Sequence, residues 1–480
     1  MTLILRSELS LLVLISLLTG LASTAFGQLE RYDLGKRLRR FEEAWSVAAE
    51  GARRESTPPM EEAVRNFFGL RLAKTAERID QGWLCLLPEK IPDWQLAAMP
   101  NGVKLNAALF DSANPEISAT LQPFYSVPDK VPETAVVRFS VKDQNGQAIQ
   151  KWQIPWRESI TPQSLRLESL PPGDYRICAE VADGESAFEL LTSSFTVVDK
   201  LGERLESLEA SYRDKESIEN PSVRAMLGDH VALFKGCQTE FVHETDFPIH
   251  QMLTLDEQLT VTDCNWKNIV RRAAEQQDLW LTLAEGRRRV PVRLRCPPKT
   301  SGPLPVLFLF HGMGGSENMF FETYGAGGAV QAGLERGWLV VAPRQGLTGL
   351  PLDIEEMLTE LEDFFAIDRS RVFLLGHSMG AGQVIRQAGL HPDLPLAAAA
   401  IGGGSAVRDA TKIAKLPWFV AAGEMDFGKR GAKAFHASLS RAGGTQLEYL
   451  EVPQVEHLVI VQAALKDAFR FFDETLSNAK

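Results

Sequence analysis

The chain of 480 residues is too long for one ordinary domain, and its 45% hydrophobic and 24% charged residues exclude global disorder and a fibrous repeat. Its net charge of −11 argues against a nucleic-acid partner, because binding phosphate groups requires clustered cations. The densest basic run, residues 287–289, is short and is typical of a solvated turn.

The first 27 residues have the pattern of a signal peptide. Arg6 precedes an apolar run at residues 11–22, and Ala25 and Gly27 have the spacing that signal peptidase recognises. A retained membrane anchor is the alternative, but the run is shorter than the about 18 residues needed to span a bilayer. The sequence therefore predicts cleavage before Gln28 and a secreted or periplasmic protein, with no stable membrane insertion afterwards.

Residues 28–100 are predicted to form a helical N-terminal segment. Apolar residues recur at steps of three and four between Leu34 and Trp45, as on one face of a helix. Pro58-Pro59 is expected to break this segment, because proline lacks the N–H that a helix interior needs. A second helix from about residue 61 to 79 then completes a helical hairpin.

In residues 101–199 the apolar residues alternate with a period of two, in short predicted strands separated by turn residues. The clearest strands are 136–141, 148–156 and 175–181. This spacing predicts a β-sandwich, similar to the immunoglobulin-like or fibronectin-like modules of secreted hydrolases. Its ligand is unknown, and a structural spacer is the favoured interpretation. Residues 200–275 return to charged helical sequence and are predicted to be a helical linker region.

From residue 276 to residue 480, short apolar strands alternate with helical patterns, which predicts a mostly parallel sheet covered by helices on both faces. The first two strands flank a turn and are expected to form an antiparallel hairpin. The predicted strands are 279–283, 290–296, 306–310, 338–341, 372–375, 397–401, 418–421 and 447–452, and the clearest helices are 354–365 and 458–476. The predicted fold class is therefore α/β with a doubly wound sheet, preceded by helical segments and a β-sandwich.

The sequence Gly376-His377-Ser378-Met379-Gly380 fits the pattern G-x-S-x-G, directly after a predicted strand and before a helical pattern. A sharp turn from strand to helix exposes a serine hydroxyl above the sheet, and glycines on both sides let neighbouring backbones approach. A surface serine in a chance match is the alternative, which the surrounding strand and helix disfavour. Ser378 is therefore the candidate nucleophile.

A glycine-rich segment, His311-Gly312-Met313-Gly314-Gly315, follows the predicted strand 306–310. A serine hydrolase needs backbone N–H groups that stabilise the negative charge of its tetrahedral intermediate. One donor is expected to be Met379 and the other Met313, with Gly312 as the alternative. A phosphate-binding loop is disfavoured, because no lysine or acidic ribose partner stands at the expected places.

His457 is the candidate general base among eight histidines. It alone lies downstream of Ser378 in a loop between a predicted strand and a predicted helix, where an imidazole can take the serine proton. The acid that orients the imidazole should follow a strand between these two residues in sequence. Glu424 and Asp426 both satisfy this condition.

Five cysteines are too few and too irregularly spaced for a disulfide scaffold. No C-x-x-C pair occurs, so a zinc or redox site is disfavoured. Export would permit one or two bridges, and Cys237–Cys264 is the favoured pair because the two lie near each other in sequence.

Residues 290–472, about two fifths of the chain, resemble the α/β-hydrolase superfamily. The most similar branch contains polyhydroxyalkanoate depolymerase-like, feruloyl-esterase-like and carboxylesterase-like secreted enzymes. The resemblance rests on the glycine-rich segment, on residues 367–372, on the serine motif and on His391-Pro392-Asp393. It implies that no metal or organic cofactor is needed.

The resemblance also distinguishes the two candidate acids. Members carry a G-x-x-D acid, which matches Gly423-Glu424-Met425-Asp426 and implies that Asp426 is the acid, with Glu424 as the alternative. Two departures from the family pattern are Ala381, where many relatives have glycine, and the lack of a glycine shortly before His457.

These patterns together predict a secreted serine hydrolase that cleaves carboxylic esters through an acyl-enzyme on Ser378. Only residues 402–417 separate two predicted strands, which leaves no room there for a large helical cap and predicts an open cleft for a small-molecule or polymer-borne ester. One alternative is a prolyl-oligopeptidase-like peptidase, although no propeller repeat is found. Another is a catalytically silent surface binding protein on the same fold.

Overall fold

The computed structural model describes residues 24–478, apart from 114–115, 129, 160–162, 167–169, 215–217, 241–242, 285–287, 299–301 and 347–351. The predicted signal peptide falls mainly on residues 1–23, outside the described residues, and residues 24–27 begin a helix. Part of the predicted basic turn at 287–289 is also outside them. No helix in the described part of the chain is long and apolar enough to span a membrane.

The described chain opens with helices α2 Thr24–Val47, α3 Glu50–Phe68, α4 Leu72–Leu86 and α5 Asp93–Ala98. The expected break at Pro58-Pro59 is wrong, because both prolines lie inside α3. Proline removes a backbone donor, but its fixed φ is compatible with a helix. The chain turns instead at residues 48–49 and 69–71. α3 packs along α4 and α4 along α2, so the segment is a group of three packed helices rather than a hairpin.

Two β-sheets follow and share one hydrophobic core. The smaller sheet has the order β1-β3-β6, and the larger has the order β2-β9-β7-β4-β5, with β8 paired to β7. The strands are β1 Asn101–Leu105, β2 Leu109–Asp111, β3 Glu116–Pro123, β4 Val136–Asp143, β5 Ala148–Pro155, β6 Gln163–Arg166, β7 Gly173–Asp183, β8 Ser186–Glu189 and β9 Ser193–Val198, with the short helix α6 Trp156–Ser159 after β5. An immunoglobulin-like sandwich stays a prediction.

The next region carries helices α7 Leu201–Arg213, α8 Pro221–Thr239, α9 Ile249–Leu259 and α10 Trp266–Gln276. α8 packs on the first strand of the following sheet and α9 packs on β7, so these helices join the two β-regions. The favoured Cys237–Cys264 bridge is wrong, because all five cysteines are free. Cys237 is buried in α8, whereas the Cys264 thiol bonds to the Leu259 carbonyl at 3.5 Å.

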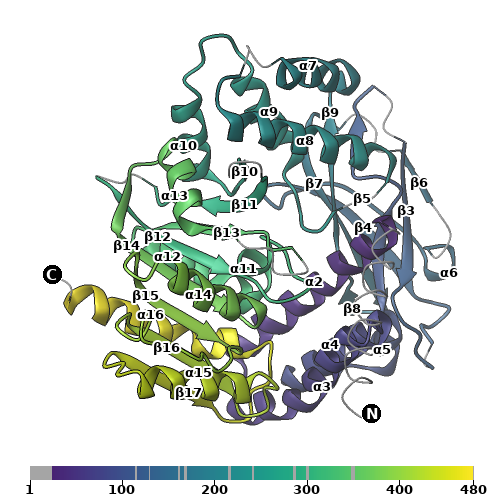
Figure 1. Ribbon diagram of the computed structural model, residues 1–480. Coiled ribbons are helices and arrows are strands. Elements are labelled where there is room, and N and C mark those ends of the chain that lie inside the picture. The colour runs from purple at the N-terminus through teal and green to yellow at the C-terminus, as the bar shows by residue number, and fades with distance from the viewer. Residues whose placement is uncertain are drawn as a thin grey trace, which may run out of the picture.

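The rest of the chain forms an eight-stranded sheet of order β10-β11-β13-β12-β14-β15-β16-β17 (Figure 1). β11 pairs antiparallel with β10 and β13, and the other neighbours pair in parallel. The strands are β10 Leu279–Leu283, β11 Val290–Arg295, β12 Leu304–Phe310, β13 Leu339–Pro343, β14 Ile367–His377, β15 Pro395–Ile401, β16 Trp418–Gly423 and β17 Leu447–Val452. All eight overlap the predicted strands, and the opening antiparallel hairpin is confirmed.

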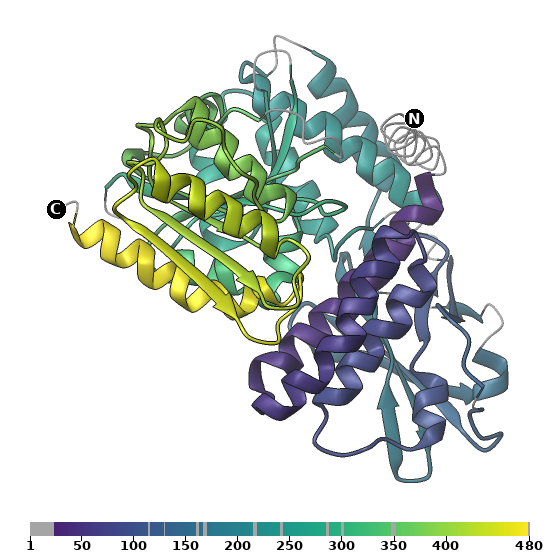
Figure 2. The same ribbon diagram turned by 60° about the horizontal axis from the view of Figure 1, so that its bottom comes forward.

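Helices cover both faces of this sheet. One core contains side chains of α13 Ile354–Glu362, α14 Met379–Leu390 and α15 Lys429–Arg441, together with α8 and α10. The opposite core contains side chains of α12 Gly328–Glu335 and α16 Ile460–Asn478, together with α2, α3 and α4. Figure 2 shows the purple N-terminal helices beside the yellow C-terminal elements. Two hydrogen bonds join them there, from Gln462 to the Glu42 carbonyl and from Thr57 to the Gln454 carbonyl.

Candidate active site

Ser378 lies in the sharp turn between β14 and α14. Its backbone has φ +56° and ψ −113°, a left-handed φ that is rare for any residue except glycine. The flanking glycines are required by close backbone approach. A Cβ at Gly380 would lie 1.9 Å from the Phe310 carbonyl oxygen, and one at Gly376 would lie 2.2 Å from the Gly380 oxygen. The turn therefore holds the serine hydroxyl at the carboxyl edge of the sheet, as in a nucleophile elbow.

The structure brings Ser378, His457 and Asp426 into one hydrogen-bonded chain. His457 Nε2 lies 2.9 Å from Ser378 Oγ, and His457 Nδ1 lies 2.7 Å from Asp426 Oδ1. Asp426 is buried and also accepts the Gly428 N–H at 2.6 Å, which fixes its carboxylate. A carboxylate on Nδ1 leaves Nε2 free to accept the serine proton. The three groups thus have the geometry of a nucleophile, a base and an orienting acid.

Glu424, the alternative acid, lies elsewhere. Its side chain is exposed, and its Oε2 accepts the Gln454 N–H at 2.9 Å instead of approaching the imidazole. β16 ends at Gly423, so Glu424 and Asp426 no longer alternate along a strand. Glu424 therefore holds the loop that carries His457, while Asp426 contacts the ring.

Of the predicted oxyanion donors, Met379 follows Ser378 directly, and Met313 and Gly312 line the same cavity as Ser378. Met379 is the first residue of α14, so its N–H has no partner within the helix. The Gly312 N–H donates to Tyr324 Oη at 3.4 Å, which directs it away from a substrate. Within the described part of the chain, no residue accepts from the Met313 N–H. The prediction of Met379 and Met313 as donors is therefore compatible with these bonds, whereas the Gly312 N–H, the alternative, donates to Tyr324.

Tyr324 links the glycine-rich loop to the histidine loop. Its hydroxyl donates to His377 Nδ1 at 2.8 Å, and His377 Nε2 donates to the His457 carbonyl at 2.7 Å. Burial and the neighbouring His457 lower the pKa of His377 well below its usual value, so the ring is neutral and can accept at Nδ1. The sequence showed His377 only as part of the serine motif, and no pattern marked Tyr324, which lies in the short helix η2 Tyr324–Gly327.

Glu456 fixes the other side of the histidine loop. This fully buried carboxyl group accepts the N–H groups of Leu458 and Val459 at 2.7 and 2.9 Å. Burial raises its pKa to about 7. The pKa of Glu42, a buried residue of α2, is raised mainly by burial and to a smaller extent by the nearby Glu456. Two acidic side chains therefore meet between the N-terminal helices and the base.

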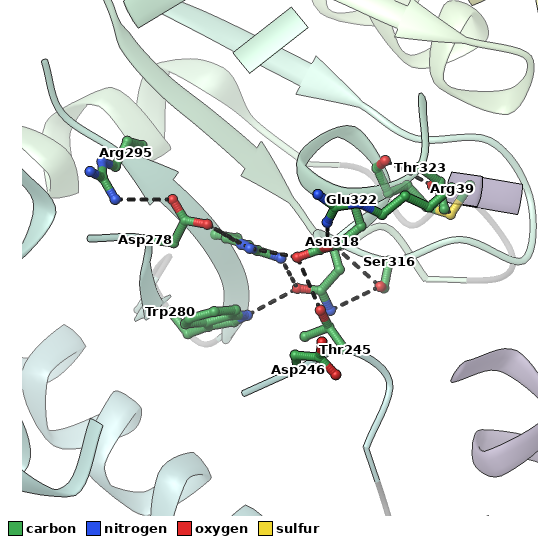
Figure 3. A network of polar contacts seen from close by, with 12 residues as sticks. Arg39, Thr245, Asp246, Asp278, Trp280, Arg295, Ser316, Asn318, Glu322 and Thr323 are labelled. Atoms are coloured by element: carbon green, nitrogen blue, oxygen red, sulfur yellow. Dashed lines mark hydrogen bonds and ion pairs between the residues drawn. The ribbon is translucent and has the colours of Figure 1, made fainter. Parts of the chain in front are cut away.

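A polar network holds the segment that follows the glycine-rich loop (Figure 3). Arg293 on β11 donates to Asn318 Oδ1 at 3.2 Å and pairs with Glu322 at 2.8 Å. Trp280 donates to the same Asn318 oxygen at 3.0 Å, and Arg39 of α2 pairs with Glu322 at 2.6 Å (Figure 3). Asn318 directly precedes helix α11 Met319–Glu322, and Glu322 is its last residue. Contacts from β10, β11 and α2 therefore all fix this helix.

A cavity of about 510 Å³ lies beside Ser378 and His457. Residues 312–316 and 318–319 line part of it, and helices α2 and α3 line another part, together with residues 189–192 and 244–246. Residues 402–417 contain no helical cap, as predicted, and the N-terminal helices α2 and α3 form part of the wall of the expected cleft.

Aromatic side chains surround the triad. Phe427 lies on the His457 ring with 3.9 Å between ring centres, and Phe68 of α3 contacts Phe427 edge to face at 5.7 Å. Phe67 lies so close to Gly314 that a Cβ there would be 2.8 Å from the ring. Phe427 follows Asp426 directly in the sequence, but no pattern indicated Phe67 or Phe68. Among the described residues, no group of three or more His, Cys, Asp or Glu side chains has a metal-binding arrangement.

No family model matches the chain, and no curated protein matches it. Solved structures similar to it include an S-formylglutathione hydrolase from Agrobacterium tumefaciens, with 19% identity, a TM-score of 0.33, and coverage of 39% of this chain and 90% of its own. A ferulic acid esterase has 17% identity, a TM-score of 0.34, and coverage of 42% and 96%. A thermostable esterase has 13% identity, a TM-score of 0.38, and coverage of 78% and 90%. The chain has a mostly parallel eight-stranded sheet with a sharp strand-to-helix turn at Ser378 after β14.

Proposed function

We propose that this protein is an exported serine esterase of the α/β-hydrolase superfamily that cleaves carboxylic ester bonds through an acyl-enzyme on Ser378. The hydrogen-bonded chain Ser378–His457–Asp426 carries the proposal. Its geometry suits acyl transfer, because a serine hydroxyl becomes a strong nucleophile only when an oriented base takes its proton.

In the proposed reaction His457 Nε2 removes the Ser378 proton while Oγ bonds to the ester carbonyl carbon. The N–H groups of Met379 and Met313 stabilise the resulting oxyanion. The intermediate then collapses, the carbon–oxygen bond to the alcohol breaks, and the His457 proton passes to the leaving oxygen. Water next attacks the acyl-enzyme while His457 takes its proton. Returning that proton to Ser378 Oγ releases the carboxylic acid.

Small-molecule esters are favoured over polymer-borne ones. α2 and α3 form part of the wall of this cavity, which limits the room for a polymer chain beside the ester. The cavity volume of about 510 Å³ lies in the range of small-molecule sites.

Export is part of the proposal and is supported by the apolar run at residues 11–22 followed by Ala25 and Gly27. Cleavage before Gln28 would remove the first turn of α2 but would keep Tyr32, whose hydroxyl bonds to Asp246 at 2.5 Å. N-terminal sequencing of the mature protein should begin at or near Gln28, and an intact Met1 in the membrane fraction would contradict export.

A panel of ester and peptide substrates tests the proposed reaction. The purified protein should hydrolyse p-nitrophenyl acetate and butyrate, and Ser378→Ala should lower kcat by roughly 10⁴ or more. Turnover of an Xaa-Pro p-nitroanilide but not of the esters would favour a prolyl peptidase. Failure to hydrolyse either class would favour a silent binding protein.

A further inference from the structure

We propose that α2 and α3 are a built-in cap that selects small esters with an uncharged, apolar group of medium size. This inference rests on the proposed esterase activity and names the substrates that the cavity admits. Its central residue is Gly35, which lies within α2 and lines the cavity.

The cavity wall is rich in apolar side chains from both sides. α2 contributes Leu34 and Leu38, α3 contributes Val64 and Phe67, and the glycine-rich loop contributes Met313. Transferring apolar surface from water to such a wall favours binding by up to roughly fourfold for each methylene group. An ester should therefore gain affinity as its apolar part grows, until the cavity is full.

Most charged side chains that line the cavity form ion pairs, with one another or with neighbouring residues. Lys36 lies 3.2 Å from Asp246 and donates to the Thr192 carbonyl at 2.7 Å, and Arg39 pairs with Glu322 at 2.6 Å. A charged substrate would lose hydration on entry and would compete with these established pairs. The wall therefore favours uncharged esters.

Gly35 provides space within the cap. It lies one helical turn from Arg31 and Arg39, which also line the cavity, so its missing side chain would point to the same side of α2. A Cβ built at Gly35 meets no atom within 4 Å. Glycine destabilises a helix interior relative to alanine, so Gly35 lowers the stability of α2 while it leaves open space beside the helix. A large side chain at this position would fill part of the cavity.

Gly51 supplies a matched control. It also lies within a helix, α3, and a Cβ built there also meets no atom within 4 Å. Unlike Gly35, it is exposed and does not line the cavity. Gly35→Phe and Gly51→Phe therefore make the same chemical change at two unobstructed helical positions.

Kinetics with p-nitrophenyl acetate and octanoate test the cap. The wild-type protein should have a kcat/KM at least about tenfold higher for octanoate than for acetate. Gly35→Phe should lower the octanoate value by about tenfold or more and the acetate value by less than about threefold. Gly51→Phe should leave both near wild type. Equal losses for the two esters in Gly35→Phe, or an unchanged octanoate value, would overturn the inference.

Binding of ethyl octanoate to the Ser378→Ala protein separates the cap from the chemistry. Calorimetry should detect binding in this background and a loss of at least about tenfold in affinity when Gly35→Phe is added. Binding that depends on Gly35 in a protein whose wild type hydrolyses no ester would support the cavity assignment and refute the proposed function. Equal affinity with and without Gly35→Phe would refute the cap even if esterase activity is found.

Discussion

The two ends of the chain contribute to one site in different ways. The loops after β14, β16 and β17 supply Ser378, Asp426 and His457, each fixed by the end of a sheet strand. Helices α2 and α3 supply only a wall, with no group in the triad. Proton transfer requires distances fixed within a few tenths of an ångström, whereas a wall requires only shape. The sheet therefore fixes the positions of the three triad side chains, and the packing of the helices shapes the access to them.

The wall nevertheless contacts the loops that carry the chemistry. Thr57 of α3 bonds to the carbonyl of Gln454, three residues before His457, and buried Glu42 of α2 faces Glu456. Arg39 pairs with Glu322, two residues before Tyr324. Loosening the cap should thus disturb the base as well as the cavity.

The largest expected effect lies within the catalytic domain and compares its two neighbouring acids. Asp426→Asn should lower kcat by on the order of 10²–10⁴, because an amide no longer holds the imidazole tautomer or stabilises its charged form. Glu424→Gln should lower it by less than about tenfold, since the Glu424 side chain accepts a loop N–H and does not contact the imidazole among the described residues. Steady-state kinetics measures both variants, with thermal melts as the folding control. The reverse ranking would assign the acid to Glu424.

A smaller loss is expected at Tyr324, which joins the glycine-rich loop to the base. Tyr324→Phe removes the donor to His377 and the acceptor for Gly312, so kcat should fall by on the order of tenfold, about the value of one buried hydrogen bond. Tyr449→Phe is the control, because that hydroxyl, on β17, bonds to the Glu451 side chain at 3.2 Å. Equal kcat values in the two variants would show that the hydrogen bonds of Tyr324 do not contribute to catalysis.

The smallest effect on activity is expected at Glu456, which lies between the two regions. Its substitution should nevertheless change the free energy of unfolding. Glu456 has a folded-state pKa of about 7, above its usual value, so the folded protein keeps a proton that the unfolded chain loses. The free energy of unfolding should therefore fall as pH rises from about 4.5 to 7, by on the order of 1–3 kcal/mol. Glu456→Gln should reduce this decrease, since buried Glu42 with its raised pKa keeps part of it, and the variant should be more stable than wild type above pH 7.

Denaturant unfolding at pH 5 and pH 8 measures this difference. Glu474→Gln, at an exposed position of α16, should keep the wild-type pH dependence. The assignment of Glu456 fails if its variant shows the same decrease as wild type.

The contrast between the regions also explains what the sequence could predict. Ser378 was identifiable from its motif directly after an apolar strand, and His457 and both candidate acids because each lies in a loop that follows a predicted strand. The choice of Asp426 over Glu424 came from the family resemblance, since both residues satisfy the strand rule.

The cap could not be predicted, because its residues contact the site only through packing across hundreds of positions. Phe67 and Gly314 lie 247 positions apart, and neither helical periodicity nor spacing relates them. The same limit applies to Tyr324. The prediction of a helix break at Pro58-Pro59 was wrong for a local reason, since the packing of α3 on α4 outweighs the loss of two backbone donors.

The most direct test of the central claim is covalent labelling of the nucleophile. A fluorophosphonate should react once per chain, forming a phosphorus–oxygen bond at Ser378 as fluoride leaves and His457 takes the hydroxyl proton. Peptide mapping by mass spectrometry should place the adduct on Ser378, and Ser378→Ala should give none. An adduct that persists in Ser378→Ala, or that maps to another residue of the wild type, would contradict the account.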